Sequence, residues 1–188
     1  MNLAELLHIL YKLACKDVAI KFHIRWCLAS EAWSFIIKKG IRKEENMYFR
    51  KAEIKDAEVL QGFMEELVDA PGDRELLERK LQRIEKLENY YLCLVCEGEE
   101  ILGTAMGILC EDICEDCRNF LVIENVFVKK ECRGLGVAAK IFEELETWGK
   151  ENSAYYSILV SEEKRERAHA FYQKAGYKKM GGFKKMLE

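Results

Sequence analysis

The chain of 188 residues carries 30 basic and 33 acidic side chains, a formal net charge of −3 at pH 7. This balance argues against a nucleic-acid partner, because no overall basic field would attract one. Hydrophobic residues make up 49% of the chain, which is typical of a globular protein with a buried core. No apolar run is long enough to cross a bilayer, so we expect no membrane partner and one domain, with or without an extension.

The first 46 residues differ from the rest and give conflicting signals. One helical face is apolar, whereas residues 20–26 alternate as a strand does; the face consists of Leu3, Leu6, Leu7, Leu10 and Leu13. Residues 1–46 are therefore interpreted as an N-terminal extension, either a helical arm or dimerisation element or a product of a start placed too early. The second hypothesis arises because the codons of residues 43–46 can form a purine-rich ribosome-binding sequence before Met47.

From Met47 onward the pattern is regular. The predicted elements are a strand at 48–53, helices at 57–69 and 74–89, strands at 90–97, 101–110 and 120–128, a helix at 136–152, a strand at 155–161, a helix at 163–176 and short strands at 177–180 and 182–187. The strands at 90–97 and 101–110 are close enough to form an antiparallel hairpin. This order predicts a mixed α/β domain around one sheet.

The cysteines indicate a reducing compartment. The start, MNLAELLHILYKLACKD, lacks the basic segment of a secretory signal, and disulfides are rare in the cytosol. We therefore expect a cytoplasmic protein whose thiols are free; they are Cys15, Cys27, Cys93, Cys96, Cys110, Cys114, Cys117 and Cys132.

Three of these cysteines lie close together in CEDICEDC, residues 110–117, with the spacing C-x3-C-x2-C. The spacing suggests an iron–sulfur or zinc site, but such sites need more ligands than this segment offers. We therefore favour a loop of free thiols and predict no metal.

A glycine-rich turn, ECRGLGVAAKIF at residues 131–142, connects the strand FLVIENVFV to a helix. The first N–H groups of a helix have no partner within the helix and favour an anion such as phosphate. Glycine lets the backbone approach that anion closely, and Arg133 adds a positive charge. The turn has no GK[ST] of a Walker A loop, and no acidic residue about 20 positions later as a Rossmann fingerprint requires. A plain tight turn is the alternative.

The same residues resemble a known family. Arg133, Gly136 and Ala138 fit the [QR]-x-x-G-x-[GA] acyl-CoA motif of the GNAT superfamily of N-acyltransferases, and RAHAFYQKAGYKK resembles its A-x-x-F-Y-x-x-x-G-[FY] signature. The resemblance covers about residues 47–188. It implies a mostly antiparallel central sheet, flanked by helices, in which one pair of parallel strands splays apart.

The resemblance also implies a cofactor site for acetyl-CoA. The pantetheine arm would pair with the strand backbone at Val126, Phe127 and Val128. The pyrophosphate would contact Arg133, Gly134, Leu135, Gly136, Val137 and Ala138. Relatives often have an asparagine that binds pantetheine at the position of Arg165, so we do not expect this contact here.

Glu124 interrupts an otherwise apolar strand, where an unpaired carboxylate is costly. It lies either at the wet end of the strand or beside a lysine, or it serves as a general base that deprotonates an amine. Family members often have an acidic residue near this strand, which makes Glu124 the first catalytic candidate.

Tyr172 is the second catalytic candidate. It falls where the family has a tyrosine that gives a proton to the departing CoA thiolate. The alternative is an aromatic core residue beside Phe171.

The expected function is therefore direct transfer of an acetyl group from acetyl-CoA to a primary amine of an acceptor that the sequence does not identify. The alternative is a regulatory protein that binds acyl-CoA without catalysis. Such a protein could lose Glu124 and Tyr172, and the presence of both favours an enzyme. A homodimer is left open.

Overall fold

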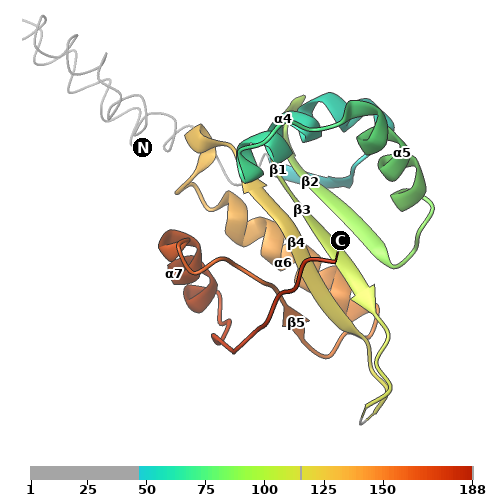
Figure 1. Cartoon of the computed structure of the whole chain (residues 1–188), viewed down its shortest axis with the longest axis vertical. Helices are drawn as coiled ribbons and strands as arrows, with labels where there is room; N and C mark the ends of the chain where they lie inside the picture. The colour runs from blue at the N-terminus through green and yellow to red at the C-terminus, as the bar shows by residue number, and fades with distance from the viewer. Residues whose placement is uncertain (1–46, 115, 188) are drawn as a thin grey trace, which may run out of the picture. The chain divides into compact units, whose positions relative to one another are not determined.

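Alternating apolar residues build a sheet of five strands (Figure 1). The computed structural model describes residues 47–114 and 116–187. The strands are β1 (Met47–Lys51), β2 (Tyr90–Glu97), β3 (Glu100–Cys110), β4 (Phe120–Val128) and β5 (Ser157–Ile158), and they lie side by side in chain order.

The sheet is antiparallel at its centre and parallel at one edge. β2 pairs with β3 and β3 with β4 in antiparallel fashion, whereas β4 and β5 are parallel. The fold is therefore mixed α/β with a mostly antiparallel sheet, which confirms the predicted fold class.

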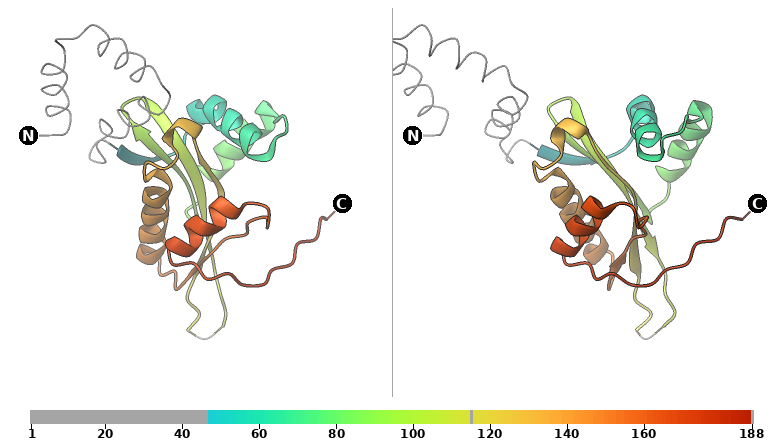
Figure 2. Two further views of the ribbon diagram at one scale, coloured as in Figure 1. Left: turned by 90° about the vertical axis from the view of Figure 1, so that its left-hand side faces the viewer. Right: turned by 60° about the vertical axis from the view of Figure 1, so that its left-hand side comes forward.

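Helices cover both faces of this sheet (Figure 2). They are α4 (Ala57–Val68) and α5 (Arg74–Ile84) on one face, and α6 (Val137–Glu151), with α7 (Glu166–Lys174) beside it, on the other. Short 3₁₀ turns precede α4 and α6, at η2 (Ile54–Asp56) and η3 (Lys130–Cys132). Of the described helices, none is long and apolar enough to cross a membrane.

The core on the α4 and α5 face is built from every second residue of the strands, because successive side chains of a strand point to opposite faces. Leu92 and Leu94 of β2 are buried there with Leu60 of α4. Phe63 of α4 stacks on Phe127 of β4 with ring centroids 4.6 Å apart. The stack fixes α4 over the C-terminal end of β4.

The core on the other face forms under α6, whose Ile141 and Leu145 are fully buried. Gly107 of β3 allows this helix to approach closely, because a Cβ there would lie 3.1 Å from both Leu145 Cδ2 and Trp148 Cζ3. α7 then packs on α6 through Phe142 and Phe171, whose rings meet edge to face at 5.2 Å.

The C-terminal end differs from the prediction. β5 covers two residues rather than 155–161, and the predicted strands at 177–180 and 182–187 are absent from the described residues up to 187. The segment instead extends away from the sheet (Figure 2), with Phe183 and Leu187 fully exposed. So short a β5 offers little edge to pair with, and an isolated pair of strands is marginal in water.

The two interpretations of residues 1–46 lie outside the described residues.

Gly103 of β3 provides the clearest stability prediction. A Cβ at this position would lie 2.6 Å from the backbone oxygen of Phe127. Gly103→Ala should therefore push β3 and β4 apart and lower the free energy of unfolding by about 1–3 kcal/mol. Gly62→Ala is the matched control, because its Cβ meets nothing within 4 Å inside α4, and the change should stabilise by about 0.5–1 kcal/mol. Equal midpoints in urea for both variants would contradict this account of the sheet.

Asp56 gives the fold an acid-sensitive contact. Burial by itself would raise the pKa of this carboxyl, but hydrogen bonds from Arg50 and from the Glu53 backbone hold the pKa below its ordinary value. Both guanidinium N···O distances to Arg50 are 2.7 Å. Because the pKa of Asp56 is lower in the folded chain than its unfolded value of about 3.9, the ionised carboxylate stabilises the fold at pH values above that unfolded pKa. This stabilisation is lost as the pH falls through the pKa of Asp56 in the folded chain.

Asp56→Asn is therefore expected to lower the free energy of unfolding by about 1–3 kcal/mol at pH 7. The difference from wild type should shrink in urea titrations at progressively lower pH. A difference that stays constant through the acid range would show that the contact does not depend on the charge of Asp56.

Candidate functional site

The parallel strands β4 and β5 separate soon after they meet. Leu121 pairs with Ser157 and Val122 with Ile158, and the ladder then ends. Beyond this point β4 continues to Val128 with no strand of the described chain on its outer edge. This stretch of edge can therefore pair with an extended ligand.

A β-bulge lies in the same part of β4. Thr104 is opposite Phe127 and Met106 opposite Glu124, so that two β4 residues, Asn125 and Val126, face a single residue of β3. Asn125 adopts a left-handed conformation with φ of 55°, which asparagine tolerates better than most residues. Bulges bend a strand and leave one residue outside the ladder, and this one lies at the predicted cofactor strand.

Glu124 lies directly before the bulge and is half-buried. Its cross-strand partner Met106 packs against the α4 and α5 core. Because opposite residues of a ladder share a face, Glu124 points to that side of the sheet. Its carboxylate forms no hydrogen bond or ion pair with any described residue, so the lysine partner considered as an alternative is not found there.

Tyr172 of α7 sits in an aromatic cluster, with ring centroids 5.7 Å from Phe142 and 6.3 Å from Tyr177. Burial raises the pKa of its phenol, Arg165 opposes this effect, and the Glu124 carboxylate adds to it. The structure thus brings Glu124 and Tyr172 within electrostatic reach, although they are 48 positions apart in sequence (172 − 124). The Tyr172 hydroxyl makes no hydrogen bond within the described part of the chain.

The glycine turn opens directly onto α6. Gly134 and Gly136 have φ values of 75° and 83°, which require the freedom of glycine. Gly136 is the N-cap residue of α6, no side chain of the described residues caps the helix, and its first turn carries no acidic residue. The N–H groups of Val137 and Ala138 therefore lack partners within the helix and form an anion-binding geometry.

Arg133 does not extend into this geometry. Its Nε donates to the Val128 carbonyl over 2.9 Å, and its guanidinium contacts Glu66 of α4 at 3.1 Å. Its backbone N–H donates to the Lys130 carbonyl at 3.3 Å. Arg133 thus braces the loop between β4 and α6 in this structure, and a phosphate contact through it stays a prediction.

Two further residues carry contacts that the sequence patterns did not indicate, and a third, Ser161, has a buried polar group. Glu66 accepts from Arg133 and also pairs with Lys130 at 3.4 Å. Arg165, at the start of α7, donates to the Leu67 carbonyl of α4 over 3.0 Å. Ser161 has a buried hydroxyl with no hydrogen-bond partner among the described residues. A buried hydroxyl without a hydrogen-bond partner is costly in free energy, and a molecule bound beside Ser161 would supply the missing hydrogen bond.

The sequence profile of the acetyltransferase (GNAT) family matches residues 56–177, from the last residue of η2 to the third residue after α7. The chain belongs to the acetyltransferase (GNAT) family. This confirms the resemblance seen in the two motifs. A comparison with curated protein sequences finds no significant match.

Solved GNAT-like structures agree with this fold. A transcriptional regulator from Bacillus halodurans C-125 is 21% identical with a TM-score of 0.70, and covers 76% of this chain and 99% of its own. A glucosamine-6-phosphate N-acetyltransferase from Arabidopsis thaliana is 23% identical with a TM-score of 0.62, covering 75% and 97%. A predicted acetyltransferase with acetyl-CoA from Clostridium acetobutylicum is 20% identical with a TM-score of 0.63, covering 75% and 96%. At these identities the likeness shows the fold alone.

Of the described cysteines, Cys93, Cys96, Cys110, Cys114 and Cys117 form no disulfide with another described residue. Within residues 47–114 and 116–187, no group of three or more histidine, cysteine, aspartate or glutamate side chains is arranged to hold a metal ion.

Proposed function

We propose that this GNAT protein transfers an acetyl group from acetyl-CoA to a primary amine. The observation that carries the proposal is that Glu124 lies on β4 just beyond its last pair with β5, within electrostatic reach of Tyr172 on α7. Each has a polar group without a hydrogen-bond partner in the described structure, and the two interact electrostatically. Such a pair suits a reaction in which one group takes a proton and another gives one.

The residues around the pair fit acetyl-CoA. The edge of β4 at Val126–Val128, on which no described strand pairs, offers backbone groups to the amides of pantetheine, as a strand does to an added strand; the Val128 carbonyl already accepts from Arg133. The uncapped start of α6, behind Gly134 and Gly136, suits a pyrophosphate. Acetyl-CoA supplies the activated thioester, and the chain supplies position and proton transfer.

Glu124 would act on the amine. An alkylamine is mostly protonated at pH 7, with a pKa of about 10.4, and the protonated form cannot attack a carbonyl carbon. The Glu124 carboxylate takes one proton of the ammonium group, directly or through water, and the nitrogen lone pair forms the new N–C bond. The nitrogen then loses its second surplus proton to water as the tetrahedral intermediate collapses to the amide. A backbone N–H near Val126 or Phe127 at the bulge stabilises the negative charge that develops on the carbonyl oxygen.

Tyr172 would act on the leaving group. As the C–S bond breaks, the phenol gives its proton to the sulfur, and free CoA thiol leaves. Burial and the Glu124 charge raise the pKa of Tyr172 despite Arg165, and this keeps the phenol protonated throughout the neutral range. The proton accepted by Glu124 returns to Tyr172 through solvent to reset the pair.

A protein that binds acyl-CoA without catalysis would need the free β4 edge and the α6 N-terminus alone. It would have no use for a half-buried carboxylate without an ion-pair partner beside a phenol. The pair therefore favours the enzyme over the regulatory alternative.

The proposal is tested with the full chain, acetyl-CoA and a panel of primary amines that includes amino acids, polyamines, aminosugars and a peptide with a free N-terminus. Free CoA thiol and the acetylated amine are measured together, the second by mass spectrometry. At least one amine should yield both products in equal amounts. Bound acetyl-CoA with no transfer to any member of the panel would favour the regulatory alternative.

A further inference from the structure

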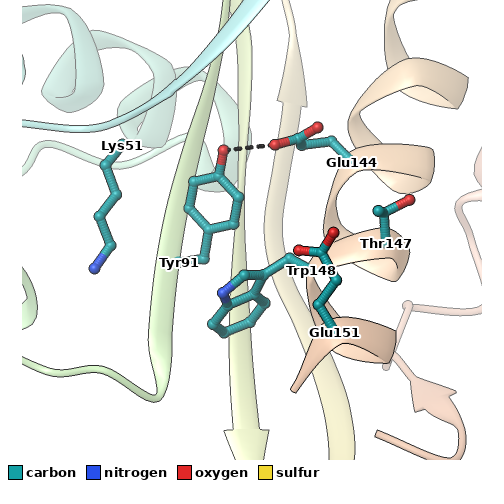
Figure 3. Close-up of a pocket in the computed structure, with 6 residues that line it drawn as sticks. All are labelled: Lys51, Tyr91, Glu144, Thr147, Trp148 and Glu151. Atoms are coloured by element: carbon teal, nitrogen blue, oxygen red, sulfur yellow. Dashed lines mark hydrogen bonds between the residues drawn. The ribbon is translucent and has the colours of Figure 1, made fainter. Parts of the chain in front are cut away.

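We propose that the chain has a second binding site, for an organic amine, on the face of the sheet opposite Glu124. A cavity of about 450 Å³ opens between β1, β2 and α6 (Figure 3). Its volume lies within the range of small-molecule sites. Its walls are formed by Lys51, Tyr91, Glu144, Thr147, Trp148 and Glu151.

The cavity is distinct from the site of acetyl transfer. Leu92 of β2 belongs to the α4 and α5 core, so its neighbour Tyr91 points to the opposite face. Tyr91 there meets Trp148 of α6 edge to face, with centroids 5.5 Å apart. Glu124 points to the α4 and α5 side. The sheet therefore separates the cavity from the proposed base.

The cavity has an aromatic floor and acidic walls. The four α6 residues that line it, Glu144, Thr147, Trp148 and Glu151, follow the spacing i, i+3, i+4 and i+7 and so share one face of the helix. Figure 3 shows Tyr91 and Trp148 between Lys51 on one side and the two carboxylates on the other. An ammonium group with an apolar body matches this lining, since aromatic faces and carboxylates both attract cations.

The charged side chains that line the cavity form no ion pairs with other described residues. Neither Glu144, Glu151 nor Lys51 forms an ion pair with any residue of the described ranges. Glu144 accepts one hydrogen bond, from the Tyr91 hydroxyl over 2.9 Å, and a carboxylate can accept several more. The Tyr91 contact holds the Glu144 side chain in place above the aromatic floor and leaves acceptor sites for an ammonium group.

The positive charge of Lys51 allows the charge dependence of amine binding to be tested in both directions. Its ammonium group repels a cation, so a plain amine binds against one unfavourable charge and two favourable ones. Removal of the Lys51 charge should therefore strengthen the binding of an amine, whereas removal of either carboxylate should weaken it. If the ligand bound through apolar contacts alone, removal of the lysine charge and removal of a carboxylate charge would not change its affinity in opposite directions.

The test is a titration of the full chain, labelled with ¹⁵N, without acetyl-CoA, so that its failure leaves the proposed acetyl transfer untouched. The indole N–H resonance of Trp148 is assigned by its loss in Trp148→Phe, since Trp26 and Trp33 also contribute. The probes are phenethylamine and 3-phenylpropionate, which share a ring and chain length but carry opposite charge. Phenethylamine should move the Trp148 resonance saturably, and 3-phenylpropionate should leave it in place.

Four variants then test the charges. Glu144→Gln, which keeps an acceptor for Tyr91, and Glu151→Gln should each raise the Kd for phenethylamine about two- to fivefold, and Lys51→Met should lower it by a similar factor. Glu143→Gln, exposed on α6 outside the cavity, is the matched control and should leave the Kd unchanged. An unmoved Trp148 resonance, an equal response to both probes, or a Kd that Glu144→Gln and Glu151→Gln leave unchanged would overturn the proposal.

Discussion

Glu124→Gln is expected to lower kcat at pH 7 by about 10²–10⁴-fold while acetyl-CoA still binds. Glutamine keeps the size and polarity of the side chain but cannot take a proton from the amine. Part of the loss should return as the pH rises toward the pKa of the acceptor amine, because more of the amine is then neutral without the help of a base. Release of CoA thiol with an acceptor that supports turnover in wild type is the measurement.

Glu58→Gln, exposed on α4, is the control for a nonspecific effect of a lost carboxylate, and its kcat should equal that of wild type. If Glu124→Gln turned over at the wild-type rate with the same pH profile, Glu124 would be a structural residue at the end of the core, and another group would have to accept the proton.

Gly136→Asp is expected to weaken acetyl-CoA binding by about 10²-fold or more. The new carboxylate would lie at the start of α6, repel the pyrophosphate and compete for the N–H groups of Val137 and Ala138. Charge-assisted hydrogen bonds contribute about 1.5–3 kcal/mol each, so the loss of two accounts for this factor. Isothermal titration calorimetry with acetyl-CoA gives the two affinities.

Gly136→Ala separates charge from backbone strain, because it places a Cβ at the same φ of 83° without a carboxylate. Its affinity should fall between those of wild type and Gly136→Asp. Circular dichroism confirms that both variants fold. If folded Gly136→Asp bound acetyl-CoA as wild type does, the anion would lie elsewhere and the role of the glycine turn would be limited to the chain reversal.

Local patterns were enough to predict most of the fold. The bounds of β2 and β4 match the predicted ranges, because each is a mostly apolar run between polar turns, broken in β4 only by Glu124 and Asn125. The start of α6 at Val137 lies one residue from the predicted start at Gly136, since glycine marks the change from strand to helix. The two predicted C-terminal strands had the composition of strands, yet the described chain gives them no long edge to pair with.

Sequence patterns singled out two residues of the proposed site but not their arrangement. Glu124 was recognisable as a charge inside an apolar run, and Tyr172 by its place in a motif. That the two act on each other electrostatically depends on the packing of α7 against α6, which no local pattern reports. Glu66 was equally hidden, because a glutamate on an amphipathic helix is ordinary until the tertiary fold places Arg133 and Lys130 beside it.

The proposed acetyl-CoA site at the separation of β4 and β5 is tested most directly by thermal unfolding of the full chain with and without acetyl-CoA, beside acetate and ATP as partial ligands. A ligand at 100 times its Kd adds about 2.7 kcal/mol to the free energy of unfolding, which raises the Tm of a chain this size by about 5–10 °C. We predict a rise of this order with acetyl-CoA, a smaller rise with ATP and none with acetate. An unchanged Tm of folded protein at millimolar acetyl-CoA would contradict the proposed cofactor and the acetyl transfer that depends on it.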